Sequence, residues 1–194
     1  MDAIPKNRLE AFSDGVIAIV ITIMVLELRP PEGGALEDMR PLLPSFLSYV
    51  LSFLYIAIYW NNHHHLLHAA KRIDGRIMWR IHLHLLFWLS LVPFVTSWLG
   101  RHSGESWPTA LYGTVLLMAG LAYVILQGAI VALEGSGSPL AKALGSDWKG
   151  KLSLASYAAA LAFAFINRQV ADALFVGVAV LWLVPDRRIE RLTH

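Results

Sequence analysis

The chain has no cysteine and carries little charge for its size. Because none of its 194 residues is cysteine, a disulfide-stapled fold is excluded. Asp, Glu, Lys and Arg make up 15% of the residues, against about 25% in ordinary soluble domains. The net charge of +2 is too small for a nucleic-acid-binding surface. Hydrophobic residues make up 56% and the mean hydropathy is +0.54, which excludes a water-soluble globule and predicts an integral membrane protein.

Six apolar stretches approach the length needed to cross a bilayer. A transmembrane helix needs about 20 mostly apolar residues, because each rises about 1.5 Å across roughly 30 Å of hydrocarbon. Pro30 and Pro31 stop the first stretch, Pro44 opens the second, and Pro93 predicts a kink within the third. The sequence therefore predicts an all-α membrane protein with one domain of six helices, at residues 9–28, 44–65, 78–99, 107–133, 152–166 and 170–184.

The last two stretches are short for full crossings. One helix over residues 152–184 would be about 50 Å long, too long for a single bilayer, so we expect a tight hairpin that turns at residues 167–169. Their many alanines favour close helix packing.

Basic residues are distributed unevenly over the alternate connections. The connections on one side of the membrane hold only Arg29, Arg40, Arg101 and Arg168, and those on the other side hold twelve basic residues. By the positive-inside rule, the richer side is cytoplasmic, which places both termini in the cytoplasm. The residues on that side are Lys6, Arg8, Lys71, Arg72, Arg76, Arg80, Lys142, Lys149, Lys151, Arg187, Arg188 and Arg191.

Polar residues cluster at the cytoplasmic ends of the first three helices. An ionisable side chain at the bilayer centre costs about 2.5–3.5 kcal/mol, so each such group needs a partner or water. Asp14 lies inside the first helix, where it serves either as a hydrogen-bonding link between helices or in an ion path. The pattern predicts one buried network. Its candidate donors on the second and third helices are Trp60, Asn61, Asn62, His63, His64, His65, His68, Arg80, His82 and His84.

Histidines raise the question of a metal site. His64 and His68 share one helix face at four-residue spacing. Membrane di-iron enzymes need several histidine clusters, whereas this chain has eight histidines in total, with His102 and His194 elsewhere. We therefore expect a hydrogen-bonded histidine patch, with no metal centre, no cofactor and no enzymatic activity.

The first helix resembles the signature of a channel family. It reads Arg8-Leu-Glu-Ala-Phe-Ser-Asp14-Gly-Val-Ile-Ala-Ile-Val-Ile-Thr22 and continues to Leu26 and Glu27. This is similar to the Arg-x-x-x-Phe-Ser-Asp signature of prokaryotic relatives of transmembrane protein 175, a lysosomal and endosomal potassium channel. The six spans, cytoplasmic termini and chain length are similar too, so the resemblance covers the whole chain.

The resemblance implies a homotetramer in the bacterial plasma membrane that conducts potassium and other monovalent cations. The first helix of each subunit would line the pore, and no Thr-Val-Gly-Tyr-Gly filter sequence is present. The family's aliphatic constriction matches Ile19, Ile23 and Leu26, with Thr22 as a polar layer. The packing motif would be Arg8, Phe12, Ser13 and Asp14, with Trp60, Asn61 and one of His63, His64 and His65 as partners.

An aliphatic ring has no dipoles to replace an ion's hydration shell, so a narrow ring blocks ions by dewetting. Potassium loses its water more readily than sodium, which predicts modest selectivity. Acidic residues beyond the constriction either raise the local cation concentration or are ordinary loop charges. Arg29 and Arg40 weaken the negative field that these residues produce. These acidic residues are Glu27, Glu32, Glu37 and Asp38.

The alternative is a proton- or cation-coupled secondary transporter. In that interpretation Asp14 and the histidine cluster would bind and relay protons. The sequence shows neither an inverted repeat nor a pair of broken helices, which are typical of such carriers.

Overall fold

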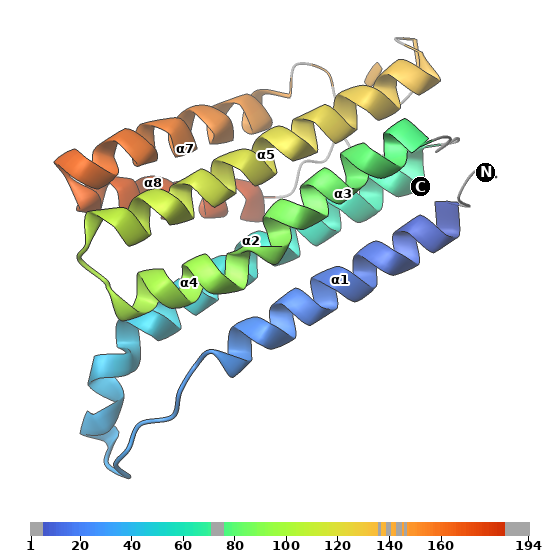
Figure 1. Cartoon of the computed structure of the whole chain (residues 1–194). Helices are drawn as coiled ribbons and strands as arrows, with labels where there is room; N and C mark the ends of the chain where they lie inside the picture. The colour runs from blue at the N-terminus through green and yellow to red at the C-terminus, as the bar shows by residue number, and fades with distance from the viewer. Residues whose placement is uncertain are drawn as a thin grey trace.

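The computed structural model describes residues 6–70, 76–135, 137–138, 141–142, 145 and 147–184. These residues form an elongated bundle of long helices (Figure 1). Its elements are α1 (Lys6–Leu26), the 3₁₀ helix η1 (Leu36–Leu42), α2 (Leu43–Ala69), α3 (Arg76–Ser90), α4 (Val92–Arg101), α5 (Ser106–Glu134), α7 (Trp148–Ile166) and α8 (Arg168–Leu183).

The helices are arranged so that α1 lies at one edge of the bundle and the α7–α8 hairpin at the other (Figure 1). On its inner side α1 packs against α2, α3 and α4. Helix α5 lies in the middle and packs against α3 and α4 on one side and α7 and α8 on the other. The chain therefore builds a continuous core behind α1 and leaves the outer faces of α1 open.

The third apolar stretch forms two helices instead of one. The expected helix over residues 78–99 is interrupted at Leu91, between α3 and α4. Proline has no N–H to donate and its ring clashes with the carbonyl four residues earlier, so Pro93 ends one helix and occupies the first turn of the next. The structure thus places the interruption at Leu91, two residues before the proline, where the backbone stays in the helical region.

The other helix ends differ by a few residues from the expected ones. Helix α1 ends at Leu26, α2 continues to Ala69, and η1 precedes α2 where no helix was expected. In the terminal hairpin, Asn167 alone separates α7 from α8. This turn is tighter than the three residues that the sequence suggested.

Four segments are long and apolar enough to cross a membrane. They are Lys6–Leu26, Leu36–His68, Trp79–Arg101 and Ser106–Glu134, a finding of length and composition alone. The hairpin α7–α8 is not among them, so the six crossings stay a prediction. Several basic residues used to orient the chain lie outside the described residues, namely Lys71, Arg72, Arg187, Arg188 and Arg191.

Small residues set the closest helix contacts in the core. A Cβ atom on Gly100 of α4 would lie 2.6 Å from the Ser45 Cα atom of α2, so only glycine allows this crossing. On α5, a Cβ at Gly113 would lie 3.0 Å from the Phe175 ring of α8. Phe175 is fully buried and its ring meets Tyr112 edge-on at 5.2 Å. Core packing therefore centres on α5.

Candidate functional site

Helix α1 has one buried face and one exposed face. Its buried residues recur at helical spacing and are Leu9, Ser13, Ile17, Val20 and Met24. The predicted lining residues are on the other side: Ile19 is 58% exposed, Ile23 44% and Leu26 79%, and Thr22 is exposed too. In one subunit these four side chains are therefore free to contact lipid or another copy of the chain, and their role in a pore stays a prediction.

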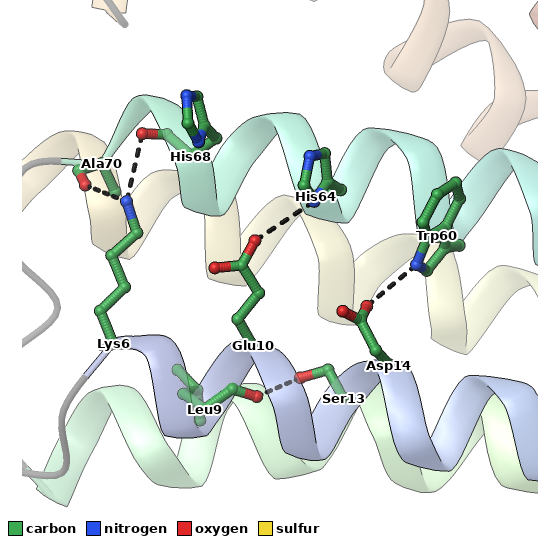
Figure 2. Close-up of polar contacts among 9 residues, drawn as sticks. All are labelled: Lys6, Leu9, Glu10, Ser13, Asp14, Trp60, His64, His68 and Ala70. Carbon is green, nitrogen blue, oxygen red and sulfur yellow. Dashed lines mark hydrogen bonds and ion pairs between the residues drawn. The ribbon is translucent and has the colours of Figure 1, made fainter.

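Four polar contacts from three side chains of α1 join its N-terminal half to α2 and to the residue that follows α2 (Figure 2). The Lys6 ammonium donates to the carbonyl oxygens of His68 at 3.1 Å and Ala70 at 2.8 Å. Glu10 Oε1 lies 3.2 Å from His64 Nδ1. The indole N–H of Trp60 donates to Asp14 Oδ1 at 2.9 Å. We call these contacts the polar ladder, and each α1 side chain with its partner one rung of it.

The ladder follows from helix geometry. Lys6, Glu10 and Asp14 recur every four residues on one stripe of α1, and their partners recur every four residues along antiparallel α2. The Lys6 ammonium meets the free carbonyls at the end of α2, where the helix dipole favours a positive charge. The Trp60 ring also stacks on His64 at 5.8 Å, which holds two neighbouring rungs together.

A second, buried chain of hydrogen bonds connects α1, α2 and α3. Ser13 Oγ donates its single proton to the Leu9 carbonyl at 2.7 Å. His82 Nε2, the next partner of Ser13 Oγ, must then be the donor, which leaves His82 Nδ1 as an acceptor. His63 Nε2 lies 3.3 Å from that Nδ1 atom and donates to it. All of these contacts are satisfied when both histidines are neutral and carry their proton on Nε2.

The buried chain ends at an unsatisfied nitrogen. His63 and His82 are 1% and 0% exposed, and their rings are 4.8 Å apart. Within the described part of the chain, neither His63 Nδ1 nor His65 Nδ1 has a hydrogen-bond partner. Buried polar atoms are costly to leave unpaired, so this histidine pair has one open position for a proton donor such as water.

The remaining motif residues differ in their surroundings. The Phe12 ring is half exposed and lies 5.7 Å from the Trp79 ring of α3. Arg8 and Asn61 are exposed, and among the described residues neither side chain has a polar partner. The structure therefore brings Phe12, Ser13 and Asp14 into contact with α2 and α3, but leaves Arg8 and Asn61 outside these contacts.

Sequence reasoning missed two rungs of the ladder and assigned no partner to Ser13. Lys6 enters the sequence analysis only as an orienting charge, and Glu10 is given no role there, although both share the four-residue spacing of Asp14. That spacing, matched by Trp60, His64 and His68 on the next helix, is the signal that could have identified them.

The far end of α1 is also held by polar contacts. Glu27 Oε2 accepts from Arg101 Nη2 at 2.7 Å and from Ser97 Oγ at 2.8 Å, both on α4. A groove of about 510 Å³ lies beside them, lined by Ile23, Glu27, Phe94, Trp98 and Arg101 among others. In the described residues, no group of three or more His, Cys, Asp or Glu side chains is arranged to hold a metal ion.

The fold and the anchored first helix define a class of protein: an all-helical membrane protein with the TMEM175 channel fold. Its architecture matches the crystal structure of a lysosomal potassium-selective channel TMEM175 homolog from Chamaesiphon minutus, with a TM-score of 0.81 and 24% identity. The match covers 94% of this chain and 97% of that one.

Sequence comparison identifies the family. The family model described as endosomal/lysosomal potassium channel TMEM175 matches residues 8–93, beginning at the arginine of the motif. A potassium channel of Chryseobacterium sp. (strain P1-3) is 48% identical over 186 residues, which is 96% of each chain. The human endosomal/lysosomal proton channel TMEM175 is 35% identical over 83 residues, 36% of this chain and 16% of that protein. The chain belongs to the TMEM175 family, a family of channels and not of enzymes.

Proposed function

We propose that this chain forms a homotetrameric, potassium-permeable channel of the bacterial plasma membrane, with six crossings per subunit and cytoplasmic termini. The names of its bacterial relative and of the matching family support potassium as the permeant ion. One structural observation carries the proposal. Helix α1 is held to the bundle along one face, and on another face the apolar side chains of Ile19, Ile23 and Leu26 are 58%, 44% and 79% exposed among the described residues.

The lining face favours a hydrophobic constriction. Four copies of Ile19 and Ile23 around an axis would exclude water from a narrow pore, because alkyl groups offer no dipoles to an ion. Opening must widen this ring enough for a partly hydrated cation. Potassium holds its hydration shell less tightly than sodium, so such a pore selects potassium modestly. The Thr22 hydroxyl, which here donates to the Ile19 carbonyl at 2.8 Å, adds one polar layer.

Single-channel recording in planar bilayers under a potassium/sodium gradient tests this function. Ile23→Asn and Ile19→Ala should raise the conductance or weaken potassium selectivity, because each widens or wets the ring. Val25→Asn is the matched control: Val25 is 46% exposed, close to Ile23 at 44%, but two residues further along it points to another side of α1. Equal effects of Ile23→Asn and Val25→Asn would show that α1 does not line the pore with this face.

The alternative is a proton- or cation-coupled transporter that uses Asp14 and the histidines. In the structure these groups contact neighbouring helices: Asp14 bonds to Trp60, and His63 and His82 belong to the buried chain. These contacts favour a structural role for Asp14. A flux that saturates with ion concentration and requires a second, coupled ion would instead support the transporter.

A further inference from the structure

Glu27 continues the predicted pore stripe beyond its last constriction residues. Ile19, Ile23 and Glu27 follow one another at four-residue spacing, and the Glu27 N–H donates to the Ile23 carbonyl at 3.2 Å. The helical path thus carries this stripe one turn past Ile23. Ile23 and Glu27 also line the same groove of about 510 Å³. The carboxylate is therefore the first charged group that the stripe presents on the side away from the polar ladder.

The structure holds this carboxylate against α4. Arg101 Nη2 and Ser97 Oγ bind the same oxygen, Glu27 Oε2, at 2.7 and 2.8 Å. Both charged side chains are 44% exposed, so the pair is open to water and ions. An exposed ion pair contributes little to stability, but it offsets a negative charge that lies next to Leu26 and one turn from Ile23 of the predicted constriction. Most of the nearby loop charges are acidic, namely Glu32, Glu37 and Asp38, against Arg29 and Arg40.

We infer that Arg101 is a specificity-determining residue, which keeps Glu27 from joining a carboxylate ring that would bind divalent cations at the outer mouth. The inference rests on the proposed function, because a tetramer brings four copies of Glu27 around the pore. Rings of acidic side chains attract and hold cations in channels, and Mg²⁺ and Ca²⁺ prefer carboxylate oxygens. A carboxylate neutralised by a guanidinium is a poor ligand for such ions. The Arg101–Glu27 pair therefore keeps the mouth selective for monovalent cations.

The test is single-channel recording of the full-length protein with and without Mg²⁺ on the outer side. Arg101→Gln frees Glu27 and should raise the inward potassium current about two-fold in about 10 mM KCl, and much less in about 1 M KCl, where charges are screened. Mg²⁺ should block this variant at a concentration about ten-fold lower than wild type. Adding Glu27→Gln to Arg101→Gln should abolish both changes, because it removes the freed carboxylate.

Arg40→Gln is the matched control, since it removes the same charge from η1, where Arg40 is exposed. Stronger Mg²⁺ block in Arg101→Gln than in Arg40→Gln supports the inference. Equal block in both, or persistence of the block in the double variant, overturns it. If Arg101→Gln does not fold, Ser97→Ala serves instead, because it removes one of the two hydrogen bonds to the same carboxylate. This variant should lower the blocking concentration of Mg²⁺ by a smaller factor. An unchanged blocking concentration overturns the inference. Absence of potassium current in wild type would overturn the proposed function and this inference with it.

Discussion

Helices α1 and α5 are both apolar and long, but they are used in opposite ways. Of the 21 residues of α1, five are buried, whereas α5 buries twelve of its 29. Helix α5 packs against α3, α4, α7 and α8 through small and aromatic side chains, and its Tyr112 and Tyr123 also contact α2. Helix α1 is joined to the bundle by one narrow apolar stripe, by the polar ladder and buried chain at its start, and by Glu27 at its end.

The difference between the two helices is that α5 stabilises the bundle, whereas α1 carries the residues of the proposed pore. Lipid offers no hydrophobic drive for helix association, so α5 depends on close van der Waals packing. In the proposed tetramer, helix α1 keeps one face open for another subunit, and directional polar contacts fix it on its remaining faces. These contacts confine its position and its rotation, which decide where Ile19 and Ile23 point.

The largest effect is expected in the α5 core. Phe175→Ala removes a ring that is 1% exposed and leaves a cavity beside Tyr112, so it should lower the free energy of unfolding by about 3–5 kcal/mol. Denaturant unfolding in mixed micelles measures this change. Phe87→Ala is the control, since Phe87 is 54% exposed and should cost far less. Similar losses would contradict the central role of the α5 contacts.

The buried chain should matter next. His82→Leu leaves the His63 N–H without its acceptor, at a cost of about 1–3 kcal/mol, and loosens α1. Because the chain has no cysteine, a single Ile17→Cys reports on this face, where Ile17 is 2% exposed. Its thiol should react several-fold faster in the His82→Leu background. His102→Leu, at an exposed position, should leave the labelling rate unchanged; if both variants label alike, the buried chain does not hold α1.

The ladder should have a smaller effect, seen in assembly. Asp14→Ala removes the acceptor of the Trp60 N–H, an exposed hydrogen bond worth about 0.5–1.5 kcal/mol, and should reduce the tetramer yield. Chemical crosslinking and size-exclusion chromatography measure that yield. Asp172→Ala on α8 is the control. Normal assembly together with altered conduction would instead assign Asp14 to the ion path.

The smallest effect is expected at an ion pair within α8. Arg168 and Asp172 lie 3.5 Å apart at four-residue spacing and are partly exposed. Asp172→Asn should change the free energy of unfolding by about 0.3–0.5 kcal/mol. A loss above that range would show that the hairpin, and not α5 alone, limits the stability of the bundle.

Much of the fold was accessible from the sequence, since apolar length and the proline and glycine boundaries locate the helices. The family resemblance also selected the first helix and its motif. The break at Leu91 was less accessible, because a proline inside an apolar run is compatible with a kink or a break, and the packing of neighbouring helices decides between them. Within the site, the residue types of the network were foreseen, but the pairing of His82 with Ser13 and of His64 with Glu10 was not.

The sequence by itself determined that this chain is a bundle of membrane helices with a polar cluster near its start, because hydrocarbon tolerates only apolar side chains and satisfied backbones. Tertiary structure alone decided which histidine meets which partner and which stripe of α1 stays uncovered. Both depend on the register and rotation of helices far apart in the chain, and these are set by packing across the bundle rather than by spacing within one helix.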